Sequence, residues 1–198
     1  MVTIGITGPS GAGKGSVSQI LQSYGFRILD ADKIYHDIIS PPSACLNELA
    51  MHFGKDILNC DGKLDRAVLS SIVFTDENKL ELLNSITHKY VVERIRSIIG
   101  CTCSIMPAAC VIDAPLLIEA GLKGDCTFTV AVLANKDIRA KRISLRDGIS
   151  PEKAMARINA QKPDDFYMQE CDYVINNNGT VSELFEIVNS ILKQRSLI

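Results

Sequence analysis

The chain has 198 residues, which is long enough for one α/β core with an inserted subdomain. Its formal net charge is −2, so it carries no overall positive charge that would attract nucleic acid or a membrane. No apolar run approaches the ~18 residues that a bilayer-spanning helix needs. The seven cysteines are typical of reduced core residues, and no signal peptide is expected ahead of the first strand, so we predict a cytoplasmic protein.

A phosphate-binding loop follows the first predicted strand. Residues 2–7 form an apolar run typical of a buried strand, and residues 8–14 read Gly-Pro-Ser-Gly-Ala-Gly-Lys ahead of a helical pattern. Glycines let successive N–H groups point at phosphate oxygens, while the lysine and the helix N-terminus add positive charge. A Gly-rich turn without a ligand is the competing interpretation, but this context favours a nucleoside triphosphate site. Its predicted ATP-binding residues are Gly11, Ala12, Gly13, Lys14, Gly15 and Ser16.

Carboxylates stand where the next predicted strands end. Asp30 and Asp32 come at the end of strand 26–30, and Asp113 ends the third strand. Ligands bind at the carboxyl ends of parallel strands, and a kinase needs a carboxylate beside the attacking hydroxyl group together with ligands for Mg²⁺. We expect one of the first two aspartates to cap the helix that starts near Lys33 and the other to have a functional role.

Helical patterns fill the roughly 75 residues between the second and third strands, a stretch too long for an ordinary crossover. These patterns cover 44–53, 65–74 and 76–99. A helical insertion at this point is where a kinase places its acceptor, so we expect the acceptor to bind there.

The alternation of short strands with helices predicts a doubly wound, parallel, five-stranded sheet. Its predicted strands cover 2–7, 26–30, 110–113, 127–133 and 172–175. The last helical pattern, 180–195, is amphipathic and is expected to pack on the sheet.

Segment 136–168 is helical and dense in Lys and Arg. Arg139, Arg142 and Arg146 share one face of its first helix. Mobile arginines neutralise the charge that develops in phosphoryl transfer. We therefore favour a lid over a solvated basic face, with Arg142 as its main functional residue.

Motifs in this order and spacing resemble the dephospho-CoA kinase family over nearly the whole chain. They are Asp-Ala-Asp at 30–32, Phe-Gly-Lys-Asp at 53–56, Asp-Gly-Lys-Leu-Asp-Arg at 61–66, Ile-Thr-His at 86–88, Ala-Pro-Leu-Leu-Ile-Glu at 114–119, Arg142 with Arg146, Arg157 with Gln161, and Asp-Tyr-Val-Ile-Asn-Asn at 172–177. The resemblance implies ATP-dependent phosphorylation of the ribose 3′-hydroxyl of dephospho-CoA, which gives coenzyme A and ADP.

The same resemblance implies a fold and a division of the chain. The fold is the P-loop NTPase fold of the nucleoside monophosphate kinase type, with a helical acceptor insertion and a lid. The implied parts are a nucleotide-binding core at 1–32, 104–135 and 169–198, an acceptor (CoA) subdomain at 33–103, and a lid at 136–168. The implied partners are ATP and dephospho-CoA, and we expect a monomer or a weak homo-oligomer.

The resemblance also assigns roles to single residues. The catalytic residues would be Asp32, Lys14 and Arg142. Asn176 would lie near the adenine of ATP. The substrate-binding residues would be Asp32, His36, Arg66, His88, Leu116 and Glu119. Ser16 and Asp113 would hold Mg²⁺ directly or through water.

Two departures from the family pattern bear on these roles. Gly15 stands where the loop usually has Ser or Thr, so Ser16 or water must replace that hydroxyl ligand. Lys89 stands where the family has proline after the motif histidine, which puts a charge at the rim of the acceptor site.

Two other functions compete with this one. The loop itself resembles that of cytidylate kinases and favours a nucleoside monophosphate kinase acting on CMP. The second alternative is a non-catalytic nucleotide-binding module, since Asn135-Lys136-Asp137 resembles a guanine-reading motif. The aspartate of that motif is one position early, however, so its side chain points elsewhere and guanine readout fails.

Overall fold

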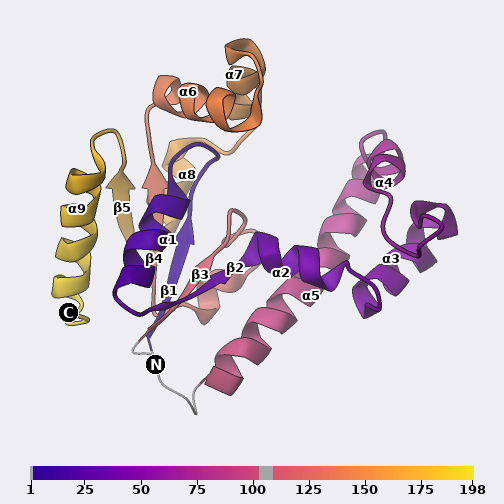
Figure 1. The fold of residues 1–198 in the computed structure, drawn as a ribbon, viewed down its shortest axis with the longest axis horizontal. Helices are drawn as coiled ribbons and strands as arrows, with labels where there is room; N and C mark the ends of the chain where they lie inside the picture. Colours follow the sequence, from indigo (N-terminus) through magenta and orange to yellow (C-terminus); the bar gives the residue numbers. More distant parts are fainter. Residues whose placement is uncertain (1, 103–108) are drawn as a thin grey trace. The chain divides into compact units, whose positions relative to one another are not determined.

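The computed structural model describes residues 2–102 and 109–198, and these residues form an α/β fold with a five-stranded sheet (Figure 1). The boundary expected between 103 and 104 lies outside the described residues. The strand order is β2-β3-β1-β4-β5. The strands are β1 Val2–Thr7, β2 Arg27–Asp30, β3 Ala109–Asp113, β4 Phe128–Leu133 and β5 Tyr173–Asn176.

Helices occupy the connections between these strands, and one more helix follows the last strand. They are α1 Lys14–Ser23, α2 Ala31–Ile38, α3 Ala44–Phe53, α4 Arg66–Val73, α5 Glu77–Thr102, α6 Lys136–Asp147, α7 Pro151–Asn159, α8 Asp164–Glu170 and α9 Val181–Gln194, with the short 3₁₀ helices η1 Lys55–Ile57 and η2 Leu122–Asp125. None of the helices in the described part of the chain combines the length and the apolar character that a bilayer crossing demands.

The central strand β1 pairs in parallel with neighbours on both sides. Ile4 lies opposite Val111 of β3 and opposite Phe128 of β4, and β4 continues the parallel pairing to β5. The predicted parallel five-stranded sheet is therefore confirmed.

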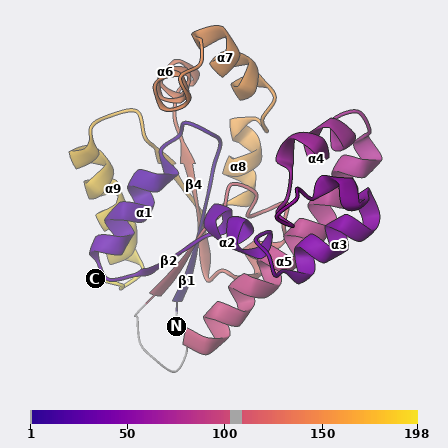
Figure 2. The same cartoon turned by 45° about the vertical axis from the view of Figure 1, so that its right-hand side comes forward.

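Strand β4 shows how the sheet sorts its side chains between two faces. Val130 and Val132 are buried in a cluster with residues of α1 and α9, whereas Ala131 and Leu133 pack with Tyr167 of α8. Successive residues of a strand point to opposite faces, so one alternating run serves both layers. Figures 1 and 2 show α1 and α9 side by side on the same face.

Helix α9 packs on the sheet as its amphipathic pattern predicts. Leu184, Val188 and Leu192 recur at a spacing of four, are almost fully buried, and join the cluster that contains Ile4. A capping box between Thr180 and Glu183 starts the helix.

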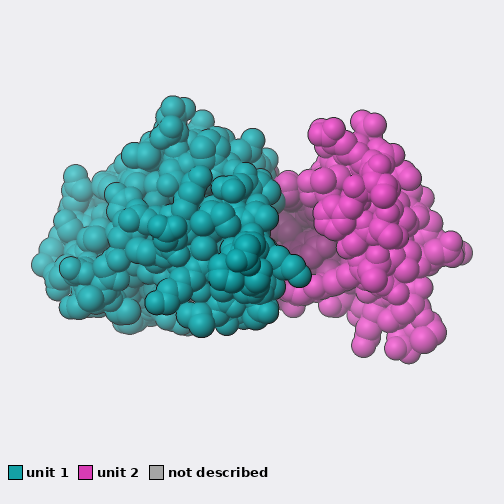
Figure 3. Space-filling view, turned by 90° about the horizontal axis from the view of Figure 1, so that it is seen from above, with its two compact units in different colours: residues 1–29, 102–198 teal, residues 30–101 magenta. Residues whose placement is uncertain are grey.

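The described residues divide into two compact units (Figure 3). Unit 1 contains 1–29 and 102–198, and unit 2 contains 30–101. Unit 2 has a core of its own, in which Leu49 of α3, Ile57 of η1, Leu69 of α4 and Ile86 of α5 are buried together. The acceptor, core and lid roles implied for parts of the chain stay predictions.

Candidate active site

The loop between β1 and α1 has a backbone that requires glycine. Gly8, Gly11 and Gly13 have φ values of 138°, 79° and 97°, in the region that L side chains rarely adopt. Gly11 is also pressed against α6, because a Cβ there would lie 2.8 Å from the backbone oxygen of Arg139. Both the dihedral angle and the close approach therefore disfavour a side chain at Gly11.

Lys14 and Ser16 stand on the first turn of α1, at the mouth of this loop. The Lys14 ammonium donates to the Gly8 carbonyl oxygen at 2.8 Å, so the side chain folds back over the loop. Ser16 is half-buried, and Gly15 beside it is exposed, with open space where a Cβ would stand. The positive charge of Lys14 and the N-terminal end of α1 therefore lie at one place, as an anion site needs.

Arg142 of α6 and Asn177 after β5 hold the carbonyl oxygens of the loop. Arg142 Nη1 donates to the oxygens of Gly11 at 3.3 Å and Ala12 at 3.2 Å, and its Nη2 donates to the Asn177 oxygen at 3.1 Å. The Asn177 side-chain amide donates to the Ala12 oxygen at 2.8 Å. With these carbonyl groups held from outside, the loop curves so that its N–H groups suit an anion.

The three arginines predicted to share one face of α6 differ in burial. Arg139 is 2% exposed and contacts the loop at Ser10, Arg142 is partly buried against the loop, and the Arg146 side chain is 59% exposed. Arg146 pairs with Asp147, and its hydrogen bond lowers the pKa of Asp147 to about 2. Arg146 also reaches the loop, where its Nη2 donates to the Ser10 hydroxyl at 3.3 Å. Arg142 differs from it in being partly buried and in holding the backbone carbonyl groups of Gly11 and Ala12.

Asp113 ends β3, and its carboxylate is engaged by α1. Its Oδ2 accepts a hydrogen bond of 2.6 Å from the Ser18 hydroxyl. No group of three or more metal-ligating side chains occurs among the residues that the structure describes. A single hydroxyl at Ser16 and a single carboxylate at Asp113 fit a metal held mainly by nucleotide phosphates and water, which is how Mg²⁺ is usually bound.

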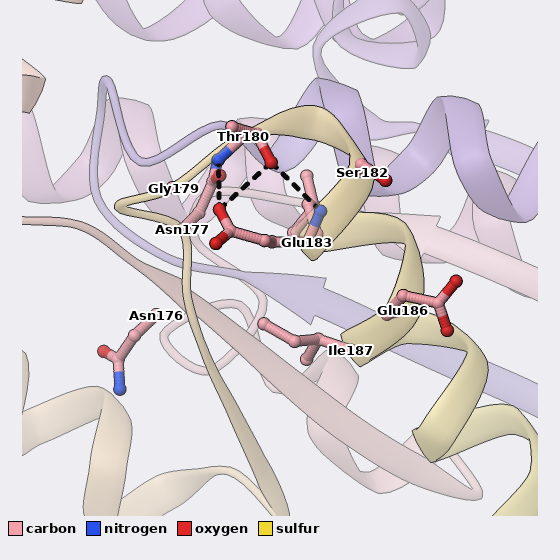
Figure 4. Close-up of a pocket in the computed structure, with 9 residues that line it drawn as sticks. Asn176, Asn177, Gly179, Thr180, Ser182, Glu183, Glu186 and Ile187 are labelled. Atoms are coloured by element: carbon pink, nitrogen blue, oxygen red, sulfur yellow. Dashed lines mark hydrogen bonds between the residues drawn. The ribbon is translucent and has the colours of Figure 1, made fainter.

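Asn176 ends β5 and lines a pocket of about 540 Å³ on the β5–α9 connection (Figure 4). The capping box also lines this pocket, and in it the Thr180 N–H donates to Glu183 Oε2 at 2.6 Å. In Figure 4 the Asn176 side chain points away from that pair. The pocket falls within the usual size range of small-molecule sites.

Asp30 and Asp32 divide the roles that were expected of them. Asp30 is the N-cap of α2, where its Oδ1 accepts from the Lys33 N–H at 3.0 Å. Asp32 lies on the first turn and is exposed, and no hydrogen bond joins its side chain to the other residues that the structure describes. The prediction that one of the two carboxylates caps this helix is confirmed, and Asp32 is the carboxylate that does not cap it.

His36 of α2 and Arg66 of α4 lie together in unit 2. The distance from Arg66 Nη2 to His36 Nδ1 is 2.6 Å. An arginine can only donate, so Nδ1 accepts and the ring proton sits on Nε2. Asp65 caps α4 through the N–H groups of Ala67 and Val68, which fixes where Arg66 begins the helix. The pair presents several donors, a suitable arrangement for an anionic group.

The other predicted acceptor residues are distributed between the two units. His88 lies half-buried on α5 of unit 2. Leu116 and Glu119 are exposed in the turn after β3, which belongs to unit 1. The residues of the phosphate-binding loop are thus brought together by unit 1, and His36 and Arg66 by unit 2.

Lys89 is engaged within unit 2. Its ammonium lies 2.8 Å from Glu48 Oε2 of α3, and the Tyr90 hydroxyl donates to the same oxygen at 2.6 Å. Helix α5 continues without a break through this position. Lys89 therefore links α5 to α3 at the position where the resemblance led us to expect a proline.

The sequence did not reveal that two residues of unit 1 shape the loop, although Arg139 was one of the three arginines expected in the lid. Asn177 was visible only as one of three successive asparagines after the last strand, and Arg139 only as one of three arginines on a face. Their loop partners are 165 and 129 residues away in the chain, so no local pattern reveals either contact.

The sequence model of the dephospho-CoA kinase family matches residues 2–183. A protein named dephospho-CoA kinase from Carboxydothermus hydrogenoformans is 40% identical, over 96% of this chain and 93% of its own. Another of that name from Corynebacterium glutamicum is 37% identical, over 98% and 97%. The solved dephospho-CoA kinase from Campylobacter jejuni superimposes with a TM-score of 0.72 at 25% identity, covering 98% of this chain and 96% of that one.

Proposed function

The chain belongs to the dephospho-CoA kinase family and catalyses the ATP-dependent phosphorylation of dephospho-CoA to coenzyme A, and we propose how its residues divide that work. The observation that carries the assignment is the family match, which spans the phosphate-binding loop and both compact units. Neither a CMP kinase nor a non-catalytic binding module is favoured by these relatives.

The donor side of the reaction belongs to the loop after β1. Its N–H groups and Lys14 would hold the β- and γ-phosphates of ATP, since both lie at the start of α1. Arg142 already reaches the carbonyl groups of Gly11 and Ala12, so a small movement of its guanidinium would bring it to the charge that develops on the transferred group. Asn176 would contact the adenine from the pocket that it lines.

The acceptor side depends on Asp32. The 3′-oxygen of dephospho-CoA attacks the γ-phosphorus, the bond from that phosphorus to ADP breaks, and the hydroxyl proton passes to a base. An exposed carboxylate with no competing hydrogen bond among the described residues is suited to orient the hydroxyl and to take this proton. We therefore assign the base role to Asp32.

The remaining acceptor contacts follow from chemistry. Dephospho-CoA carries a diphosphate, and the neighbouring donors of His36 and Arg66 are suited to bind such an anion. His88, Leu116 and Glu119 would complete the acceptor side, within a subdomain at 33–103 and the turn after β3. Segment 136–168 would act as the lid.

ATP-dependent P-loop kinases generally need a divalent metal ion, and we propose Mg²⁺ here. Ser16 would supply its hydroxyl ligand, and Asp113 would hold a coordinated water while Ser18 fixes the carboxylate. The bound ion would neutralise charge on the β- and γ-phosphates.

The experiment that tests the function compares acceptors. ADP release is coupled to a spectrophotometric signal with ATP and Mg²⁺ present, and dephospho-CoA, CMP or no acceptor is added. We expect release with dephospho-CoA alone. Release with CMP but not dephospho-CoA would mean that the loop, and not the rest of the chain, indicates the substrate.

Location and assembly are further proposals. Because its donor is ATP, we propose that the enzyme acts in the cytoplasm, and we propose a monomer or a weak homo-oligomer. Cell fractionation tests the first, where recovery in another compartment would contradict it. Sedimentation velocity tests the second, where one tight oligomer at every concentration would contradict it.

A further inference from the structure

Arg139 is the largest side chain that is almost fully buried in the described part of the chain, at 2% exposure. Charged side chains are rarely buried unless they are paired, because a guanidinium loses its hydration on burial. Burial accordingly lowers the pKa of Arg139, yet arginine stays protonated in proteins. A charge kept in this position needs a reason beyond packing.

The partners of the guanidinium come from separate segments of unit 1. Nε donates to the Ser10 carbonyl oxygen of the phosphate-binding loop at 3.0 Å. Nη2 donates to Gln161 Oε1 after α7 at 2.6 Å, and Nη1 lies 3.6 Å from Asp164 Oδ1 at the start of α8. One planar, rigid group therefore links the loop to the connection between α7 and α8.

The backbone at the same position also supports the loop. The space behind Gly11 is closed by the oxygen of Arg139 at 2.8 Å, by its Cα at 3.1 Å and by the Ile143 side chain at 3.0 Å from an added Cβ. Ile143 is fully buried. The first turns of α6 thus form the outer wall of the phosphate-binding loop, and the Arg139 guanidinium ties that wall to Ser10.

We infer that Arg139 is a positioning residue for phosphate binding, which holds the curvature of the loop through the Ser10 carbonyl group and couples it to the α7–α8 connection. It acts through the loop and not on ATP itself. This inference rests on the proposed function, since it names a residue that serves the ATP side of that reaction.

The inference has a kinetic signature. Loss of the guanidinium leaves the loop free to relax, so the phosphates of ATP meet N–H groups that are no longer aligned. ATP binding should weaken, whereas the KM for dephospho-CoA should stay near the wild-type value. We expect about a tenfold rise in the KM and Kd for ATP, the size that follows from losing a hydrogen bond from a charged donor.

The test uses the full chain with substitutions Arg139→Met and Arg139→Gln. Methionine keeps apolar volume without a donor, whereas glutamine keeps one amide donor for the Ser10 oxygen and buries no charge. The control is Arg195→Met. Arg195 lies over the rings of Phe128 and Tyr173, 4.7 and 5.0 Å from their centroids, and donates to the Tyr173 hydroxyl at 2.8 Å, and these partners lie outside the phosphate-binding loop. KM for both substrates, kcat and Kd for ATP are measured below the melting temperature of every variant.

Support for the inference is a higher KM and Kd for ATP in Arg139→Met, partial recovery in Arg139→Gln, and no change in Arg195→Met despite its own loss of stability. An unchanged Kd for ATP in either Arg139 variant, or an equal rise for both substrates, would overturn it. If Arg139→Met does not fold, the glutamine variant alone decides, and a wild-type Kd there counts against the inference. Wild-type protein that fails to phosphorylate dephospho-CoA would instead reject the proposed function.

Discussion

The aspartate pair at the start of α2 offers a matched test of the acceptor side, because the two carboxylates are two positions apart and differ in role. Asp30 caps the helix through the Lys33 N–H, whereas Asp32 is exposed on the first turn. We predict that Asp30→Ala lowers stability and keeps most of the turnover, and that Asp32→Ala keeps stability and loses turnover.

The magnitudes follow from these contacts. Loss of an N-cap side chain costs about 1 kcal/mol, and the Asp30–Lys33 ion pair at 3.7 Å adds little because the Lys33 side chain is 83% exposed. For Asp32, loss of an interaction with the helix dipole costs about 0.3–1 kcal/mol, and the higher helix propensity of alanine offsets much of it. Removal of a general base should lower kcat by about 10²–10⁴-fold.

The assay pairs urea unfolding with coupled ADP release at saturating ATP and dephospho-CoA. We expect Asp30→Ala to change stability and leave kcat near the wild-type value, and Asp32→Ala to change kcat and leave stability near the wild-type value. Asp32→Ala with kcat within about threefold of wild type would refute the base role. An Asp32 variant that loses as much stability as Asp30→Ala would recast this carboxylate as structural.

Three further predictions concern unit 1. Gly11→Ala should lower the free energy of unfolding by about 1–3 kcal/mol, because the φ of Gly11 is 79° and a Cβ would meet a backbone oxygen at 2.8 Å. Gly15→Ala should instead stabilise α1 by about 0.5–1 kcal/mol, because a Cβ at Gly15 meets open space. Urea unfolding of the two variants checks this prediction, and equal effects on stability would contradict it. The hydrogen bond from Arg146 lowers the pKa of Asp147 from 3.8 to about 2. The Asp147 carboxylate therefore stabilises the folded protein fully above pH 3.8, and this contribution is lost as the pH falls through about 2. The difference in melting temperature between wild type and Asp147→Asn should shrink between these two pH values, and a constant difference would show that the Asp147 carboxylate does not contribute to stability in this way. Ser16→Ala should raise the Mg²⁺ concentration that half-saturates turnover, and an unchanged Mg²⁺ titration would remove Ser16 as a ligand.

Features encoded by neighbouring residues were predictable from the sequence. Strand β1 has the bounds expected of it, β2, β3 and β4 differ from their expected bounds by one residue at the start, and β5 is shifted by one residue at both ends. The phosphate-binding loop and the helix cap after β2 were likewise visible, because a Gly-rich turn and a capping carboxylate depend on residues within a few positions. Family membership, the fold and the reaction were also expected from the order of the motifs, and the comparisons confirm them.

Features that depend on distant partners were not predictable. Segment 136–168 was expected to be helical and to contain a second helix after the first, but its sequence does not show that α8 buries Tyr167 against β4. The spacing of arginines on α6 shows a common face, but not that Arg139 would be buried by a loop 129 residues away. Lys89 similarly finds Glu48 at a separation of 41 residues.

The central claim is that the enzyme transfers the γ-phosphate of ATP to the ribose 3′-hydroxyl of dephospho-CoA. The most direct measurement is mass spectrometry with ³¹P and ¹H NMR of the product formed by the purified chain from ATP and dephospho-CoA. The account predicts a product heavier by one phosphate, with a new monoester on the 3′ carbon and one ADP released for each product. A phosphate at another position, or ADP released without a phosphorylated product, would contradict it.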